Sequence, residues 1–293
     1  MKKIVIIGDE RAEGNQWRDA FRNRDEKYQV FFVEVNKLCD VGVRRRKKDE
    51  DSLYISTKTE GFWAPDGLIW RWGAVKPNWI HEPFLELLKS FPKFPMVSRP
   101  EAHLICANRL RMLSALSSDP EIPIVPHVAF VTSRFLIESR YKPEYPCVVK
   151  VGSYHQGLMK AKVDNDDRWH DLLSFIFPLE MPVVIEDFIK FNRDLRLIFI
   201  GDEVWSLVRE FEGWKANRLK RLYVEKPTEE MLKLTKRARE AIGNPEYGAL
   251  DLVETDDGFV VFEINDTPDL DPDTIQVEDS YRKVADILIN KMD

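Results

Sequence analysis

Short apolar runs alternate with amphipathic stretches over the first hundred residues. A run such as KKIVIIG at 2–8, apolar at nearly every position, is typical of a strand that is buried on both faces of a sheet. The predicted elements of this part are strands at 2–8, 28–35, 66–73 and near 96, and helices at 15–24 and 80–91. Strands that alternate with helices favour a parallel sheet covered by helices, so residues 1–98 are predicted to form a small Rossmann-like α/β domain.

Two features of this domain bear on ligand binding. Gly8 ends the first strand, but no Gly-x-Gly-x-x-Gly motif follows it, so Gly8 by itself does not establish a dinucleotide site. The charge run VRRRKKDEDS at 43–52 can form either an anion-binding patch or a solvated loop. Because acidic residues follow the basic ones at once, we favour the loop.

Strands become more frequent in the second part of the chain. A single helix is predicted at 100–116, followed by an extended segment in which Pro123 and Pro126 exclude a helix. From residue 147 onward the predicted strands are 147–151, 158–163, 183–186, 195–200, 203–210, 248–254 and 259–264, and the predicted helices are 167–176, 228–242 and 278–292. The fold class is therefore α/β, with α+β character in the C-terminal part.

Composition narrows the function classes. The 293 residues are 44% hydrophobic and 32% charged with a net charge of -6, so no global positive charge favours nucleic acid or an anionic membrane. Three isolated cysteines match neither a zinc site nor a disulfide framework, which indicates a reducing cytoplasm. No apolar run reaches the roughly 18 residues of a membrane span. The apolar run after the basic start is too short for a signal peptide, so we expect a first strand there.

The stretch CVVKVGSYHQGLMKAKV at 147–163 contains a lysine on a strand and two glycines, and it raises the question of a phosphate-binding loop. The usual P-loop ends in Gly-Lys-Ser/Thr and leads into a helix. Here Leu158 follows Gly157, and the alternation from Met159 onward has the period of a strand. We therefore predict a strand, a loop containing Gly152 and Gly157, and a second strand, with Lys150 on the first of them.

An acidic hairpin is the best candidate for a metal site. The stretch GALDLVETDDGFVVFEIN predicts two strands joined by an acidic turn. Residues two apart on a strand share a face, so Glu263 and Asn265 can lie beside Asp251 of the partner strand. Carboxylate and amide oxygens suit Mg²⁺ held between protein and nucleotide phosphates. A surface hairpin with outward polar residues is the alternative, but the surrounding run is mostly apolar, and unpaired acids in such a run are costly.

The segment between these two motifs offers further polar groups. Residues 186–189, which are Glu186, Asp187, Phe188 and Ile189, combine backbone donors and acceptors with apolar side chains, which suits an adenine edge and a ribose. Asp194 and Arg196 share a face of the next strand, and Arg209 on the partner strand can join Arg196 near a transferring phosphate. Taken singly, such Asp and Arg pairs are more often structural. The five histidines are scattered and match no catalytic triad.

The order of these motifs resembles the ATP-grasp superfamily, and the local sequence is most similar to its synapsin-like and RimK-type ligase branches. CANRLRMLSAL resembles the segment that carries the family's first nucleotide-binding lysine, which places Arg109 at that position and Asn108 where the family has an acid. The resemblance implies that Lys150 and the 152–157 loop bind and cover phosphates. It further implies that residues 186–189 bind adenine and ribose and that the metal hairpin holds Mg²⁺, or Mn²⁺ in its place.

The resemblance also implies an organisation and an activity. The expected units are a pre-ATP-grasp domain at 1–98, a central subdomain with the phosphate-covering hairpin at 99–183, and a C-terminal subdomain with the magnesium hairpin at 184–293. The expected activity is ligation of a carboxylate, of amino-acid or peptide type, to an amine through an acyl phosphate at the expense of ATP. The alternative is a synapsin-like ATP-binding regulatory protein without ligase turnover. A homodimer and a homotetramer are both open for the assembly.

The acceptor side departs from the RimK-type pattern. The basic stretch at 211–224 lacks a glycine pair, and Asn265-Asp266-Thr267-Pro268-Asp269 stands where Asn-Ser-x-Pro-Gly is usual. The predicted substrate contacts in the basic stretch are Lys215, Asn217 and Lys220. Its positive charge favours an anionic substrate, while a solvated loop is almost as well supported.

Overall fold

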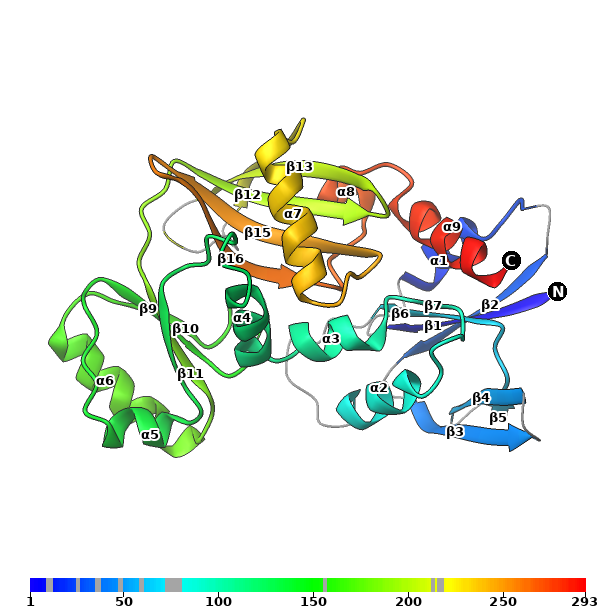
Figure 1. The fold of residues 1–293 in the computed structure, drawn as a ribbon, viewed down its shortest axis with the longest axis horizontal. Coiled ribbons are helices and arrows are strands. Elements are labelled where there is room, and N and C mark those ends of the chain that lie inside the picture. Colours follow the sequence, from blue (N-terminus) through cyan, green and yellow to red (C-terminus); the bar gives the residue numbers. More distant parts are fainter. Residues whose placement is uncertain are drawn as a thin grey trace.

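The apolar runs at the start of the chain form a parallel sheet. The structure is a computed structural model that describes residues 1–8, 13–24, 27–34, 38–46, 50–57, 61–71, 81–154, 157–211, 214 and 219–293. The sheet order is β2-β1-β6-β7, with β1 at Lys2–Gly8, β2 at Tyr28–Glu34, β6 at Gly67–Arg71 and β7 at Met96–Val97. The interior of β1 is fully buried because α1 (Gly14–Ala20) and α9 (Ser280–Met292) cover one face and α2 (His81–Lys89) covers the other (Figure 1). The predicted Rossmann-like start of the chain is confirmed.

A small antiparallel sheet contains the charge run that was expected to be a loop. Its strands are β3 (Leu38–Arg46), β4 (Glu50–Thr57) and β5 (Gly61–Trp63), in that order. Leu53 and Ile55, two residues apart on β4, are buried in the apolar cluster beneath the parallel sheet. The backbone ladder continues from these anchors into the charged residues, so the prediction of a loop was wrong where these two strands run.

Two helices replace the single helix predicted at 100–116. They are α3 (Pro100–Cys106) and α4 (Arg109–Ser117). Between them Asn108 has an extended backbone, and its side-chain oxygen accepts a hydrogen bond from the backbone N–H of Arg111 at 3.1 Å. Asparagine is a strong N-cap residue, so it starts a new helix rather than continuing the old one. The break places Arg109 on the first turn of α4.

A middle sheet carries the predicted phosphate hairpin. Its order is β10-β9-β11-β8, with β8 at His127–Phe130, β9 at Cys147–Val151, β10 at Lys160–Val163 and β11 at Val183–Asp187. Three short elements cover one face: α5 (Ser133–Glu138), α6 (Asp166–Ile176) and a 3-10 helix (Phe177–Leu179). Val149 and Ile185 point into that apolar layer. The alternate residues Lys150 and Glu186 therefore point to the other face, away from these helices.

The C-terminal sheet is antiparallel and carries the predicted metal hairpin. Its order is β14-β13-β12-β15-β16, with β12 at Arg193–Ile200, β13 at Glu203–Phe211, β14 at Leu219–Glu225, β15 at Tyr247–Thr255 and β16 at Gly258–Asn265. On one face α7 (Glu229–Ala241) packs with α4. On the other face, apolar residues at one end of the sheet pack against α8 (Pro272–Ile275) and α9.

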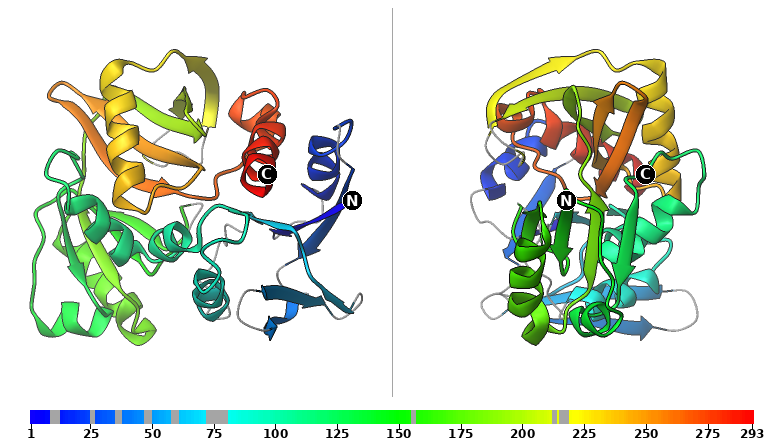
Figure 2. Two further views of the ribbon diagram at one scale, coloured as in Figure 1. Left: turned by 45° about the vertical axis from the view of Figure 1, so that its right-hand side comes forward. Right: turned by 90° about the vertical axis from the view of Figure 1, so that its left-hand side faces the viewer.

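The C-terminal helix links the two ends of the chain. Val284 and Leu288 of α9 share an apolar cluster with Ile4 and Ile6 of β1 and with Ile198 of β12. Figure 2 shows α9 between the N-terminal and C-terminal sheets, with the middle sheet set apart. The domain boundaries at 98 and 183 remain a prediction. Among the described residues, no helix has the length and apolar character needed to cross a membrane.

Candidate nucleotide and metal site

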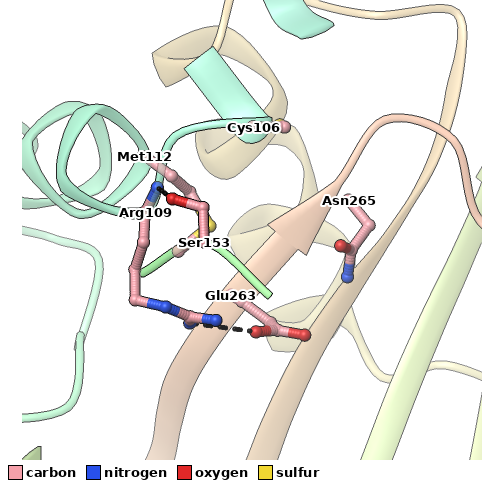
Figure 3. A pocket seen from close by; sticks show the side chains of 6 residues that line it. All are labelled: Cys106, Arg109, Met112, Ser153, Glu263 and Asn265. Carbon is pink, nitrogen blue, oxygen red and sulfur yellow. Dashed lines mark hydrogen bonds and ion pairs between the residues drawn. The ribbon is translucent and has the colours of Figure 1, made fainter. Parts of the chain in front are cut away.

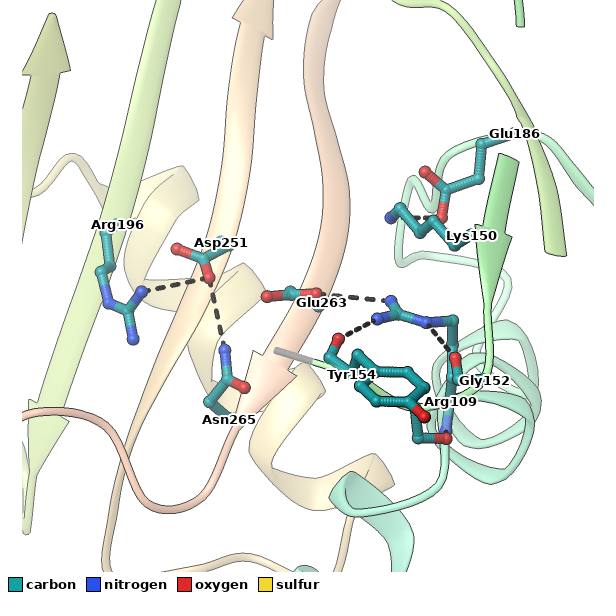
Figure 4. A network of polar contacts seen from close by, with 10 residues as sticks. Arg109, Lys150, Gly152, Tyr154, Glu186, Arg196, Asp251, Glu263 and Asn265 are labelled. Carbon is teal, nitrogen blue, oxygen red and sulfur yellow. Dashed lines mark hydrogen bonds and ion pairs between the residues drawn. The ribbon is translucent and has the colours of Figure 1, made fainter. Parts of the chain in front are cut away.

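Arg109 connects three elements at the centre of the candidate site. Its Nε and Nη2 donate to the carbonyl oxygens of Gly152 and Tyr154, at 3.3 and 3.0 Å. Its Nη1 lies 3.5 Å from Oε2 of Glu263 on β16, and its backbone N–H donates to Oγ of Ser153 at 2.9 Å. Figure 4 shows the guanidinium between Gly152 and Tyr154 at the base of the hairpin and Glu263 on β16.

The predicted phosphate hairpin is present, with two glycines where the chain reverses. Gly152 and Gly157 have φ of +65° and +71°, a region that costs other residues roughly 1 kcal/mol or more. Strand β10 begins at Lys160, two residues later than predicted, because Leu158 and Met159 belong to the turn. Lys150 and Lys160 pair in register across the hairpin, so the described residues confirm a strand-loop-strand unit rather than a loop that leads into a helix.

Lys150 forms a buried ion pair with Glu186. Their Nζ and Oε1 atoms lie 2.5 Å apart, and the residues are 2% and 1% exposed. Burial lowers the pKa of Lys150 to about 8, and the carboxylate of Glu186 offsets part of that shift. The ammonium also lies 5.7 Å from the centre of the Phe262 ring of β16. The pair therefore lies on the side of the middle sheet that faces β16.

Two backbone N–H groups of the segment predicted to bind adenine already donate hydrogen bonds within the protein. The backbone N–H groups of Asp187 and Phe188 donate to the carbonyl oxygens of Pro126 and Pro146 at 3.0 and 3.3 Å. These two N–H groups already have partners within the protein, so binding of an adenine edge by this segment remains a prediction. The Phe188 ring is covered by the ammonium of Lys162 from β10, 4.4 Å from its centre.

Two arginines and two aspartates form one network across β12, β13 and β15. Asp251 lies 3.4 Å from Nη1 of Arg196 and 3.0 Å from Nη1 of Arg209. Arg209 also donates from Nε to Asp194, its register partner on β12. Burial raises the pKa of Asp194 to about 6, although Arg209 acts in the opposite direction. All four side chains share the face of the sheet that is opposite to α7, so Asp194 and Arg196 lie on one face as predicted.

A β-bulge in β16 determines which of its side chains share a face with Asp251. Asp251 is paired with Glu263, but the next pair is Leu252 with Val261, so Phe262 is an extra residue in β16. Val261 and Ile264 are thus both buried in the core beneath α7, while Glu263 faces the same side as Asp251. The bulge explains how acidic residues occur within an apolar run.

A pocket lies where these elements meet. Its volume of about 220 Å³ includes open solvent, so it is an open pocket and not an enclosed cavity. Figure 3 shows its lining residues, which are Cys106, Arg109, Met112, Ser153, Glu263 and Asn265. Three of them, Arg109, Glu263 and Asn265, were predicted as site residues. The structure thus brings the predicted nucleotide cation and two of the three predicted metal ligands to one pocket.

The donor set fits a magnesium ion. Asp251 and Glu263 are opposite each other in register, and the side chain of Asn265 lies 3.3 Å from Oδ2 of Asp251. Across the part of the chain that the structure describes, no three His, Cys, Asp or Glu side chains form a metal cluster. Two carboxylates and one amide would leave half of an octahedron to water and phosphate oxygens, and Mg²⁺ sites in proteins usually keep such ligands.

Several neighbours of the site were not found from the sequence. His103 of α3 lies 2.9 Å from Asp266, which directly follows Asn265, and both side chains are buried. Cys106 lies beside the same aspartate, and burial with that charge raises the pKa of its thiol well above the usual range. The spacing of His103 and Asp266 in the chain gives no signal for this contact. Lys215 and Asn217 lie outside the described residues, and Lys220 is described only as a backbone position on β14.

The fold is the ATP-grasp fold. The structure matches a RimK-domain ATP-grasp protein from Sphaerobacter thermophilus with a TM-score of 0.70 and 20% identity, over 98% of this chain and 99% of that one. It also matches D-alanine–D-alanine ligase from Bacillus anthracis with a TM-score of 0.66 and 16% identity, over 100% of this chain and 97% of that one. At these identities the likeness concerns the fold alone.

The family follows from the sequence match. Residues 101–293 match the family described as the ATP-binding domain of synapsin, and the chain belongs to that family. Two curated relatives are ligases. The tetrahydromethanopterin:α-L-glutamate ligase of Methanocaldococcus jannaschii is 39% identical over 139 residues, which are 45% of this chain and 46% of the relative. The α-aminoadipate–LysW ligase LysX of Saccharolobus solfataricus is 31% identical over 142 residues, which are 45% and 52%. The chain spans about half the length of the curated relatives it matches.

Proposed function

We propose that this protein is an ATP-dependent ligase that joins a carboxylate of amino-acid type to an amine and uses Mg-ATP. One observation carries the proposal: the predicted nucleotide cation of α4 and two predicted oxygen ligands of β16 line one pocket. The ammonium of Lys150 on β9 lies 5.7 Å from the centre of the Phe262 ring on the same strand β16. Membership of an ATP-binding family supports the nucleotide. The two curated relatives, an α-L-glutamate ligase and an α-aminoadipate ligase, support the reaction class.

The chemistry asks mainly for positioning and charge neutralisation. An oxygen of the substrate carboxylate attacks the γ-phosphorus, and the bond to the bridging oxygen breaks with its electron pair, which leaves ADP. The amine then attacks the acyl carbon, phosphate leaves, and the amine loses a proton to solvent. A bound Mg²⁺ would neutralise phosphate charge and tie the nucleotide to the protein.

The chain's own residues divide this work between two sides of the pocket. We assign Lys150 and Arg109 to binding of the α- and β-phosphates. We assign Arg196 and Arg209 to stabilising charge on the transferring phosphoryl group, with Asp251 holding both guanidinium groups in position. Each of these cations already has a carboxylate partner, so the site is compensated before nucleotide binds.

Two further features belong to the proposal. The acceptor is an anionic amino acid or peptide that contacts the basic segment with Lys215, Asn217 and Lys220. We place the activity in the cytoplasm because Cys106 and Cys147 are buried free thiols.

The test is the release of ADP and phosphate with ATP, Mg²⁺ and paired amino-acid and carboxylate substrates, beginning with L-glutamate and α-aminoadipate. Glu263→Gln should lower turnover by at least about 10²-fold, since it removes one of two metal carboxylates. Glu254→Gln is the matched control, because Glu254 lies on the same hairpin but pairs with Arg193. Turnover that survives Glu263→Gln would refute the metal role. Tight ATP binding with no product over the whole screen would favour the synapsin-like alternative without turnover.

A further inference from the structure

The base of the phosphate-covering hairpin is fastened to α4 at two levels. The backbone N–H of Arg109, which no helical carbonyl can satisfy at the start of a helix, donates to Oγ of Ser153. The guanidinium of the same residue holds the carbonyl oxygens on both sides of that serine, those of Gly152 and Tyr154. Three consecutive residues of the hairpin therefore contact one residue of the helix.

The hairpin is shaped for this contact. Gly152 has a left-handed backbone, and its own N–H donates to the carbonyl oxygen of Pro182 at 2.7 Å. The Tyr154 ring packs against the α-carbon of Gly152, where an added Cβ would lie 3.0 Å from the ring. The tight turn directs its carbonyl groups towards α4. The sequence of the turn and the position of Arg109 are thus matched to each other.

The remaining guanidinium nitrogen of Arg109, Nη1, reaches Glu263 on β16. Nη1 of Arg109 lies 3.5 Å from Oε2 of Glu263, and the Arg109 side chain is only 10% exposed. Figure 4 shows the planar group with one edge towards the hairpin and the other towards Glu263. Arginine carries five N–H donors in a rigid fork, whereas lysine carries one ammonium. A lysine cannot hold two separate carbonyl groups and a carboxylate from this position.

We propose that Arg109 is a positioning residue that clamps the base of the phosphate-covering hairpin to Glu263, and thereby couples the position of this lid to the metal ligand. Any group that engages Glu263 competes for one of the three partners of Arg109, so the two sites influence each other's free energy. The catalytic consequence rests on the proposed ligase function. The contacts of the clamp are present in the protein without ligands.

Hydrogen exchange of the full chain without nucleotide tests the clamp directly. Arg109→Lys keeps the charge and loses the fork, so peptides that contain Gly152 and Tyr154 should exchange about tenfold faster than in the parent protein. Arg111→Lys is the matched control, two residues along α4, since Arg111 pairs with the exposed Glu82 instead. Peptides from β12 should be unchanged in both variants, which shows that the fold is intact. Unchanged exchange of the hairpin in Arg109→Lys would overturn the proposal.

A second variant guards against misfolding of the first. Ser153→Ala removes only the hydroxyl that accepts from the backbone of Arg109, and it should accelerate exchange of the same peptides by about threefold. Unchanged exchange in Ser153→Ala would contradict the two-level attachment.

Kinetics separate the clamp from a simple phosphate contact. With the charge retained, a pure phosphate contact predicts that Arg109→Lys keeps kcat within about twofold and changes mainly KM for ATP. A lid clamp predicts instead that kcat falls about tenfold. If the parent protein makes no product, the ligase proposal fails while the exchange experiment still decides the clamp.

Discussion

The middle and C-terminal sheets both bury charged side chains, but the charges are compensated in different ways. On the middle sheet a single lysine and a single glutamate, Lys150 and Glu186, are buried together almost completely. On the C-terminal sheet Asp251 is shared between two arginines, one of which also binds Asp194. The arginine side chains there are 24% and 14% exposed, so solvent reaches the network.

The difference predicts how each sheet tolerates the loss of one charged side chain. Removing one partner of a buried pair leaves an uncompensated charge away from water, which costs far more than the pair contributes. In a shared network the remaining partners and nearby water compensate part of the loss. Loss of a charged partner on the middle sheet should therefore mainly lower the stability of the protein. Loss of one on the C-terminal sheet should mainly lower turnover.

The largest effect is expected for Glu186→Ala. The stranded ammonium of Lys150 should lower the free energy of unfolding by about 3–5 kcal/mol, measured by urea denaturation. Asp164→Ala, which breaks the exposed pair with Lys162 on the neighbouring strand, should change it by less than about 1 kcal/mol. The double variant Lys150→Met with Glu186→Leu should recover most of the loss. Equal effects of Glu186→Ala and Asp164→Ala would remove the contrast between the two sheets.

Asp251→Asn should have a smaller effect on stability and a large one on turnover. Because Arg209 keeps Asp194, the free energy of unfolding should fall by only about 1–2 kcal/mol in the same urea experiment. ADP formation should fall by about 10²-fold, as for a lost metal carboxylate. A stability loss as large as that of Glu186→Ala would show that the network is not shared.

The two sheets should also differ in pH dependence. Arginine stays charged, but burial lowers the pKa of Lys150 to about 8, so its ammonium is fully present below that pH and is lost above it. KM for ATP should therefore rise by up to about tenfold per pH unit above pH 8. The nearby charge of Lys160 contributes to the lowered pKa, so Lys160→Met should move the rise to higher pH. A profile that is flat between pH 7 and 10 would exclude Lys150 from phosphate binding.

The smallest effect is expected in the lid. Gly157→Ala should cost about 1 kcal/mol, because an alanine is strained at φ of +71°. Turnover should slow while most of the ATP affinity, measured by calorimetry, remains. Leu158→Ala, at an exposed neighbouring position, is the control. Lys150→Met in the Glu186→Leu background, which leaves no unpaired buried charge, should instead weaken ATP binding outright. If this variant and Gly157→Ala behave alike, the segment is not a lid.

Local pattern predicted much of the fold. Apolar runs and alternation located the strands from residue 147 onward and the metal hairpin, since both depend on neighbours in the chain. The break before α4 was missed because an asparagine inside a helical pattern becomes a cap only when the next helix has a surface to pack on. Strand β3 was missed because its pairing depends on two buried anchors in β4. Strand β14 was missed because its basic residues were interpreted as a substrate-binding stretch or a solvated loop.

The sequence by itself determined which chemical groups are present and in what order: a lysine on a strand, glycines at a turn, and an acid-rich hairpin. Those choices are local, because backbone conformation and alternation are set over a few residues. Only the tertiary structure decided which charges meet. Lys150 reaches Glu186 because β9 and β11 are neighbours in the middle sheet, and Arg109 reaches both the hairpin and Glu263 because the N-terminus of α4 lies between them. Such contacts join residues 36 to 154 positions apart, and burial rather than sequence spacing makes them strong.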